Sequence, residues 1–151
     1  MDKITENMNE KPIVFDLFSG TGTIGQVVSK NSKYVYGIEI VEEAVEKANE
    51  NARLNGIENA RFIAGDVFEK LDELNNLKII PDILILDPPR SGVGEKTITK
   101  LVKYNTKNII YVSCNPKTLM TDLIKFGEFG YRLVRCSVVD MFPVTPHLEV
   151  V

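Results

Sequence analysis

The sequence predicts a doubly wound α/β domain, in which helices cover both faces of a mostly parallel sheet. Short apolar runs rich in β-branched residues alternate along the chain with segments whose apolar residues recur at helical spacing. The runs are apolar throughout, as expected for strands that are covered on both faces. A glycine-rich turn directly follows the first run, where this fold class often binds its ligand.

The elements follow from these patterns in order along the chain. Strands are expected at residues 13–18, 34–39, 60–65, 82–87, 108–114, 131–139 and 147–151. A helix is expected from about Val41 to Ala52, with Asn55 and Gly56 as its carboxyl-terminal cap, and further helices near 22–31, 94–104 and 116–127. Ligands in such a sheet lie beyond the carboxyl ends of the strands, so functional residues are expected just after each strand.

Length and composition indicate one ordinary globular domain. The chain has 151 residues, of which 44% are hydrophobic and 26% charged. Residues 1–11 form a polar leader that we expect to be disordered or truncated, and residues 12–151 form the domain; both ends look cut from something longer. No run is long enough to span a bilayer and the leader lacks a signal sequence, so we expect a cytoplasmic protein without a membrane partner.

Charge and cysteine content exclude some functions. The net charge is -3 and the pI about 5.3, the opposite of the basic surface of a protein that binds nucleic acid by itself. Cys114 and Cys136 form no CxxC pair and are too few for a structural zinc site, so no metal is expected.

The end of the first strand carries a candidate nucleotide site. The turn DLFSGTGTIG contains Gly20, Gly22 and Gly25 in a GxGxxG arrangement, which permits close approach of the backbone to a ligand. Glu39 follows Gly20 by 19 positions, where an acid can accept hydrogen bonds from ribose hydroxyls. Without the glycines, Glu39 would be read as a surface residue at the end of a strand.

Three acids are expected along the same rim: Glu39, Asp66 and Asp87, each at the end of a strand. A pyrophosphate would be repelled by them, whereas a ligand with a sulfonium cation and an adenosine would not. The sequence therefore favours S-adenosylmethionine over NAD, and an NAD-dependent oxidoreductase remains the weaker alternative.

The fourth and fifth strands end in residues suited to chemistry. Asp87 precedes Pro88 and Pro89, which hold the chain extended and present the carboxylate stiffly. Cys114 precedes Asn115, a suitable N-cap, so the thiol lies at the positive end of a helix, which favours thiolate. Cys136 falls in the middle of an expected strand and is interpreted as a core or strand-face residue.

The last segment, DMFPVTPHLEVV, contains the one histidine of the chain. If it is a strand, His147, Glu149 and Val151 share one face, and Leu148 and Val150 the other. The order of the elements does not by itself bring Glu149 to Cys114.

Taken together, the motifs of this chain resemble those of the RNA uracil C5-methyltransferase family, which makes 5-methyluridine in ribosomal or transfer RNA. The motifs are DLFSGTGTIG, GIE, GDV, LDPPRSG, VSCNPKTL and DMFPVTPHLE. The resemblance covers residues 12–151 in the same order. It implies a Rossmann-like class I methyltransferase sheet with an antiparallel edge, and S-adenosyl-L-methionine as cofactor. It also implies roles for single residues. Cys114 matches the nucleophile and Glu149 the general base; the cofactor positions are Phe18, Gly20, Gly22, Thr23, Glu39, Asp66 and Asp87, with Asp87 also near the target base.

The chemistry of the family explains these residue types. C5 of uracil is a poor nucleophile until a thiolate adds at C6, and a base must then remove the C5 proton so that the thiol can leave. The target uridine must be unstacked to reach such a pocket. The sequence of the glycine turn, DLFSGTGTIG, favours ribosomal RNA over transfer RNA as the substrate.

The chain also departs from the family pattern. Members carry an RNA-binding β-barrel domain and a cofactor-contacting glutamine ahead of this region, and neither is present in these 151 residues. An RNA-binding domain is therefore expected upstream, and the isolated fragment is expected to be inactive or only to bind the cofactor. Methylation of an amino group, which Asp-Pro-Pro motifs serve in related folds, is a further alternative, although it needs no thiol.

Overall fold

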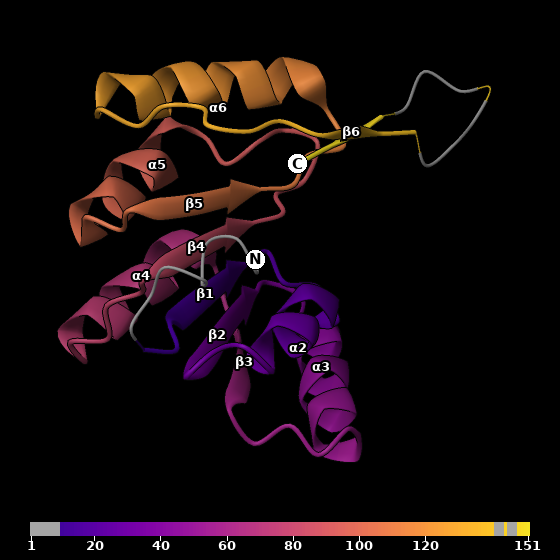
Figure 1. Cartoon of the computed structure of the whole chain (residues 1–151). Helices are drawn as coiled ribbons and strands as arrows, with labels where there is room; N and C mark the ends of the chain where they lie inside the picture. Colours follow the sequence, from indigo (N-terminus) through magenta and orange to yellow (C-terminus); the bar gives the residue numbers. More distant parts are fainter. Residues whose placement is uncertain (1–9, 141–143, 145–147) are drawn as a thin grey trace.

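The computed structural model describes residues 10–140, 144 and 148–151. Its sheet contains β1 (Ile13–Leu17), β2 (Tyr34–Glu39), β3 (Ala60–Ala64), β4 (Ile83–Leu86) and β5 (Asn108–Tyr111). The helices that connect them are α2 (Thr23–Ser29), α3 (Glu42–Leu54), α4 (Val67–Asn76) and α5 (Glu95–Leu101), the last followed by the short 3₁₀ helix η1 (Val102–Tyr104). After β5 come α6 (Pro116–Glu128), β6 (Val138–Val139) and β7 (Glu149–Val150). Figure 1 shows the helices on the two sides of the sheet.

The five strands are parallel and stand in the order β3-β2-β1-β4-β5. The chain winds outward from β1 to β3 and then crosses to the other side of β1 to form β4. The carboxyl ends of β1 and β4 therefore flank a switch point, where open α/β sheets bind their ligands. The predicted doubly wound fold is confirmed.

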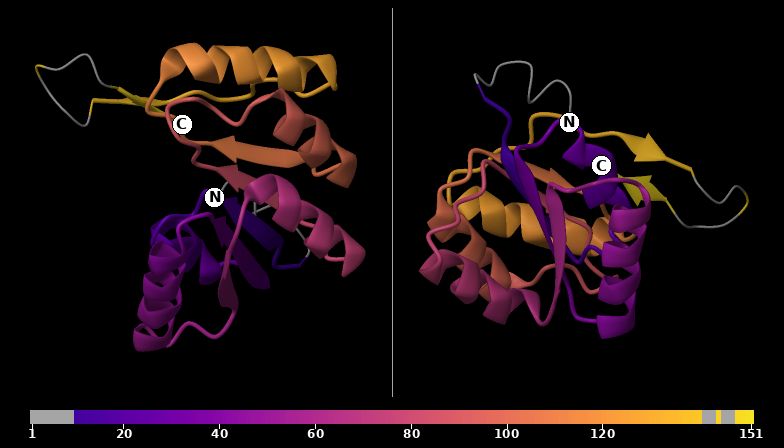
Figure 2. Two further views of the ribbon diagram at one scale, coloured as in Figure 1. Left: turned by 180° about the vertical axis from the view of Figure 1, so that it is seen from behind. Right: turned by 90° about the horizontal axis from the view of Figure 1, so that it is seen from below.

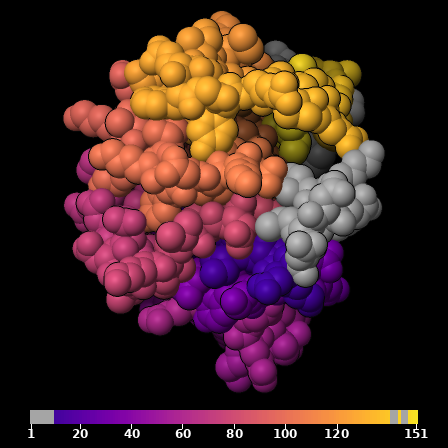
Figure 3. Space-filling view, turned by 60° about the vertical axis from the view of Figure 1, so that its left-hand side comes forward, coloured from indigo at the N-terminus to yellow at the C-terminus, as the bar shows by residue number. Residues whose placement is uncertain are grey.

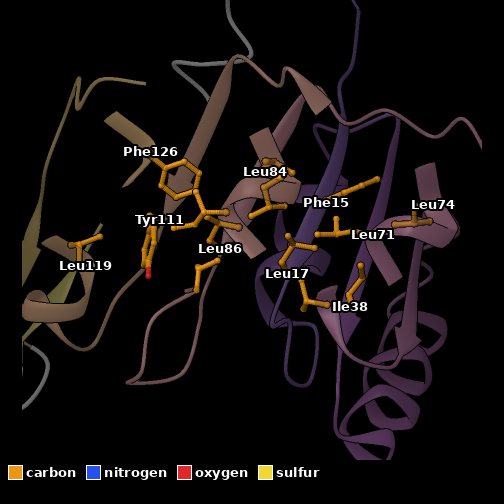
Figure 4. Packing of buried hydrophobic residues seen from close by; sticks show 14 of the residues in the cluster. Phe15, Leu17, Ile38, Leu71, Leu74, Leu84, Leu86, Tyr111, Leu119 and Phe126 are labelled. Carbon is orange, nitrogen blue, oxygen red and sulfur yellow. The ribbon is translucent and has the colours of Figure 1, made fainter. Parts of the chain in front are cut away.

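Alternate side chains of each strand enter different cores. Phe15 and Leu17 belong to the larger cluster, which α4, α5 and α6 cover (Figure 4). Val14 lies on the opposite face, in a smaller cluster against α2, and α3 packs there around Phe62. Both faces of β1 and β4 are thus buried, which accounts for their uninterrupted apolar sequences. One charged residue, Asp16, lies fully buried within β1.

A short antiparallel pair extends the sheet beyond β5. Strands β6 and β7 pair with each other, and β7 is joined to the chain just after β5 by a bridge between Ser113 and Val150. The pair lies beside the carboxyl end of β5 (Figures 1 and 2). The expected antiparallel edge is therefore present.

Two expectations about the elements were wrong, and one helix was not predicted. The long strand expected at 131–139 is reduced to Val138–Val139, and the residues before it lie largely on the surface (Figure 3). Cys136 is consequently exposed and precedes the strand instead of packing in its middle. Helix α4 was not predicted, although Val67, Leu71 and Leu74 bury one face of it at helical spacing.

The remaining boundaries agree to within a few residues. Helix α3 ends at Leu54 and Gly56 has a φ of 66°, so the predicted glycine cap is confirmed. Helix α6 has Asn115 as N-cap and Pro116 as its first residue, also as predicted. The polar leader up to residue 9 and His147 lie outside the described residues.

Candidate active site

The turn after β1 leaves the sheet through left-handed backbone conformations. Phe18, Gly20 and Gly22 have φ values of 64°, 52° and 75°, and α2 begins at the exposed Thr23. A Cβ on Gly22 would lie 2.6 Å from the ring of Phe62 and 2.9 Å from Cβ of Ala48. Only glycine therefore fits at this position, where the turn packs against β3 and α3.

Glu39 ties the end of β2 to this turn. Its Oε2 accepts a hydrogen bond of 2.9 Å from the backbone N–H of Gly20, and its Oε1 accepts one of 3.0 Å from Val41. Each carboxylate oxygen has a second lone pair, so the group can still accept bonds from ribose hydroxyls. Ile40, next to it, is 66% exposed and adds apolar surface beside the acid.

Asp66 follows β3 on the same rim. It is exposed and is the N-cap of α4, where its Oδ1 accepts a bond of 3.3 Å from the N–H of Glu69. The expectation that Glu39, Asp66 and Asp87 lie along one edge is consistent with the parallel register, because β2, β3 and β4 all end there.

Asp16 lies in β1 beside the glycine turn, and the sequence analysis did not single it out. Its Oδ2 accepts a bond of 2.8 Å from the N–H of Gly25, whereas its Oδ1 has no partner among the described residues. Burial raises the pKa of Asp16 to about 7 against the effect of the Gly25 bond, and the carboxylate of Asp87 adds to the rise. A charged residue inside the apolar run IVFDLF was the signal that could have revealed it.

Asp87 stands at the switch point. Its backbone N–H donates to the carbonyl oxygen of Leu17 at 3.2 Å, which joins the ends of β4 and β1. Burial raises the pKa of the Asp87 carboxyl, and the carboxylate of Glu149 adds to this effect. Glu149 is therefore close enough to Asp87 for the two charges to interact, although they come from distant parts of the chain.

A backbone bridge between Ser113 and Val150 joins the segment that carries Cys114 to the one that carries Glu149. The N–H of Ser113 donates to the Val150 carbonyl oxygen at 2.8 Å, and the N–H of Val150 donates to that of Ser113 at 2.9 Å. In an antiparallel pair, the residues adjoining such a pair stand opposite each other with closely spaced side chains. The bridge is isolated, so the ladder does not continue to the next pair, but it leaves Glu149 and the partly buried Cys114 each next to a bridged residue on adjoining segments. The sequence alone did not predict that β7 lies beside the segment that carries Cys114.

The start of α6 supports the position of Cys114. Asn115 caps the helix, its Oδ1 accepting a bond of 3.2 Å from the N–H of Lys117. The backbone between β5 and α6 is thus fixed on one side by β7 and on the other by a helix cap.

The arrangement gathers carboxylates around one point of the rim. Asp16 interacts with Asp87, and Asp87 with Glu149. After burial, the charge of Asp87 raises the pKa of Asp16 and the charge of Glu149 raises the pKa of Asp87, so a cationic group placed there would be stabilised. Among the residues that the structure describes, no cluster of histidine, cysteine and acids could hold a metal ion, and no helix is long and apolar enough to cross a membrane.

Solved structures place this fold among methyltransferases. A precorrin-6y C5,15-methyltransferase from Geobacter metallireducens aligns with 98% of this chain and 84% of its own at a TM-score of 0.74, and its 14% identity shows the fold alone. The tRNA (uracil-54, C5)-methyltransferase of Pyrococcus abyssi, solved with S-adenosyl-L-homocysteine, has a TM-score of 0.79 and 31% identity over 98% of this chain and 35% of that one.

Residues 2–151 match the tRNA (Uracil-5-)-methyltransferase family, and the chain belongs to it. An uncharacterized RNA methyltransferase of Clostridium tetani is 52% identical over 138 residues, which are 91% of this chain and 30% of the relative. Another, from Fusobacterium nucleatum, is 47% identical over 148 residues, 97% of this chain and 31% of the relative. The family predicted from the motifs is confirmed, and the chain spans less than a third of the length of these relatives.

Proposed function

We propose that this chain is the methyl-transfer domain of an enzyme that methylates C5 of uridine in RNA, with S-adenosyl-L-methionine as methyl donor. The observation that carries the proposal is the isolated bridge between Ser113 and Val150, the neighbours of Cys114 and Glu149 in the chain. The interaction of Asp87 with Glu149 supports the same arrangement. A thiol and two carboxylates at a switch point are the groups that the reaction requires.

The residues present fit the cofactor. Its adenosine part would be held by Glu39 and Asp66, beside the turn that contains Phe18, Gly20, Gly22 and Thr23. The acid cluster of Asp16, Asp87 and Glu149 would favour a ligand that carries positive charge. A pyrophosphate at the same place would be repelled, which argues against NAD. When bound, the cofactor supplies the methyl group.

Cys114 would begin the reaction on the RNA. Its thiolate adds to C6 of the uracil ring, the C5–C6 double bond opens, and the electron pair is delocalised over C5 and the C4 carbonyl. C5 thereby becomes nucleophilic enough to accept the methyl group. Asp87, at the end of β4, would orient the ring between the thiol and the donor.

Glu149 would complete the reaction as a general base. After methylation, C5 carries both a methyl group and a proton. Removal of this proton by the Glu149 carboxylate restores the double bond and expels the Cys114 thiolate from C6. Glu149 lies on β7, next to the Val150 that bridges to Ser113, so the base that takes the proton and the thiolate that leaves would come from adjoining segments.

The RNA itself would be bound largely by other parts of the full-length protein. The net charge of this chain is -3, which offers little attraction for phosphates. An RNA-binding domain upstream, as in the family, would supply that surface. We propose ribosomal RNA as the target ahead of transfer RNA; methyl transfer to each, purified from cells that lack the gene, distinguishes the two.

RNA that contains 5-fluorouridine tests the proposal. The fluorine at C5 cannot be removed as a proton, so the covalent adduct persists. Full-length protein with S-adenosylmethionine should give a denaturation-resistant protein–RNA complex, and Cys136→Ser should give the same yield because Cys136 is exposed outside the site. Adduct that forms undiminished in Cys114→Ala would refute the role of Cys114.

A cofactor-binding module without turnover is the second candidate. The observation in its favour is that the chain covers only 30% of the Clostridium tetani relative. Calorimetry with S-adenosylmethionine, beside a methyl-transfer assay on the same chain, distinguishes the two functions. Binding without transfer by this chain would favour the module.

A further inference from the structure

A buried acid on α6 holds the loop that follows Asp87. Asp122 is 5% exposed and faces residues 90–94, which connect β4 to α5. Its Oδ2 accepts a hydrogen bond of 2.7 Å from the N–H of Val93, and its Oδ1 a longer one of 3.4 Å from that of Gly94. Two consecutive backbone donors of the loop thus end on one side chain of the helix.

Tyr111, the last residue of β5, completes this contact. Its hydroxyl donates to Oδ2 of Asp122 at 2.6 Å. Burial, and then the bond to Asp122, raise the pKa of the Tyr111 hydroxyl, which therefore keeps its proton and remains a donor. Figure 4 shows Tyr111 among the core side chains, near Leu86 and Leu119. One carboxylate thus joins β5, α6 and the loop after β4.

The first turn of α6 contacts the same loop closer to Asp87. Nδ2 of Asn115 donates to the Arg90 carbonyl oxygen at 2.9 Å, and Oγ1 of Thr118 donates to it at 3.2 Å. We call Tyr111, Asn115, Thr118 and Asp122 the α6 clamp.

The loop is shaped to fit the clamp. Gly92 has a φ of 82°, and a Cβ on it would lie 2.7 Å from Oδ2 of Asp122 and 3.3 Å from Cβ of Thr118. Its N–H donates to the Pro89 carbonyl oxygen at 2.9 Å, which closes a turn. The loop therefore approaches α6 as closely as a backbone can.

These contacts connect the two reactive groups of the site. The loop begins directly after Asp87 and its prolines, and α6 begins directly after Cys114 and Asn115. A displacement of the loop from α6 would change the distance between Asp87 and Cys114. Small errors of placement have large effects on rate, about 100-fold for roughly 1 Å.

We propose that Asp122, together with Tyr111, is a positioning residue that holds the loop after Asp87 on α6 and so fixes Asp87 relative to Cys114. The inference rests on the proposed function for its catalytic meaning. Asp122 touches neither substrate nor cofactor in this account and acts only through the loop and the helix.

Two variants test it beside a matched control. Tyr111→Phe and Asp122→Asn should slow adduct formation with 5-fluorouridine RNA, per folded molecule of full-length protein, by about three- to tenfold and about ten- to 100-fold respectively. The KM for S-adenosylmethionine should stay within about twofold of the wild-type value, because a loss of positioning lowers kcat. Tyr104→Phe removes the hydroxyl of a partly buried tyrosine, which donates to the Leu71 carbonyl oxygen of α4. It should lower thermal stability without changing the rate.

A rate per folded molecule that is unchanged in both Tyr111→Phe and Asp122→Asn would overturn the proposal and leave the clamp a purely structural feature. A second readout does not depend on catalysis. In a Cys136→Ser background, the alkylation rate of Cys114 by iodoacetamide should change in Asp122→Asn and not in Tyr104→Phe. If wild-type protein forms no adduct, the proposed function fails, and this alkylation rate alone decides: a change supports the clamp and a constant rate overturns it.

Discussion

The rim of the sheet has two sides that are built differently. On the cofactor side, which comprises the ends of β1, β2 and β3, each acid is bonded to backbone groups nearby in the sequence. The backbone donor lies three positions away in the sequence for Asp66, nine positions away for Asp16 and at most 19 positions away for Glu39. On the reaction side, which comprises the ends of β4, β5 and β7, contacts such as that of Asp122 with Val93 span 29 positions.

This difference indicates whether cofactor binding can persist when the chemistry is lost. The cofactor side is organised by its own turn, so loss of a reactive group elsewhere should leave it intact. The reaction side exists only when three distant segments are assembled, since Asp87 and Cys114 follow neighbouring strands of the sheet and Glu149 lies on β7, which is bridged to Ser113. Cofactor binding and chemistry should therefore be separable by mutation.

The largest expected effect separates the two sides. Cys114→Ala should lower methyl transfer to RNA by at least about 10⁴-fold, because the uracil ring is then not activated. Its affinity for S-adenosylmethionine, measured by calorimetry, should stay within about twofold of wild type. Cys136→Ala serves as the matched control and should change neither quantity. A parallel loss of cofactor binding in Cys114→Ala would show that the two sides are not independent.

The next effect concerns the stability of the cofactor side as a function of pH. The pKa of Asp16 is raised from 3.8 to about 7, so between these values the folded protein holds a proton that the unfolded chain releases. The free energy of unfolding of the wild type should therefore fall as the pH rises from about 4 to about 7, by on the order of 4 kcal/mol from this group.

Asp16→Asn lacks this loss. The unfolding free energy of Asp16→Asn should rise relative to that of the wild type as the pH goes from about 4 to about 7. At higher pH the difference between the two proteins should stay constant, as measured by urea denaturation at a series of pH values. A difference between the two proteins that is independent of pH would contradict the assignment of a buried, neutral Asp16.

The smallest effect tests the anchor of the glycine turn. Glu39→Gln replaces one acceptor oxygen by an amide that faces the backbone donors of Gly20 or Val41. Loss of hydrogen bonds to a charged group costs about 1.5–3 kcal/mol, so the Kd for S-adenosylmethionine should rise roughly ten- to 100-fold. Glu43→Gln, an exposed acid in the first turn of α3, should bind as the wild type does. Equal affinities for both variants would remove Glu39 from the site.

The same division explains what the sequence could predict. The glycine turn, the cap of α6 and the acids at strand ends are local patterns, and Gly22 and Asn115 adopt the conformations expected of them. The bridge between Ser113 and Val150 joins segments far apart in the chain, and periodicity does not encode such a contact. The apolar run at 131–139 was predicted as one strand, yet most of it has no partner to form a ladder and only Val138–Val139 pairs with β7.

Burial explains the remaining omission. Asp16 was not singled out: a charged residue inside the apolar run IVFDLF is a signal, but the sequence does not show how deeply such an acid is buried. Its complete burial under the turn at Gly25 becomes visible only in the packed structure. The clamp on α6 is similar, since nothing in the spacing of Tyr111 and Asp122 indicates that both contact a loop of another strand.

The most direct test of the account combines both sides of the rim in one molecule. Full-length Glu149→Gln is incubated with ordinary uridine RNA and S-adenosylmethionine labelled in its methyl group. The Cys114 thiolate should add to the uracil ring and the ring should be methylated, but the variant should be unable to remove the C5 proton. Mass spectrometry should then find the label on a uridine joined to the peptide that contains Cys114. Normal release of methylated RNA by this variant, or a labelled adduct on any residue other than Cys114, would contradict the account.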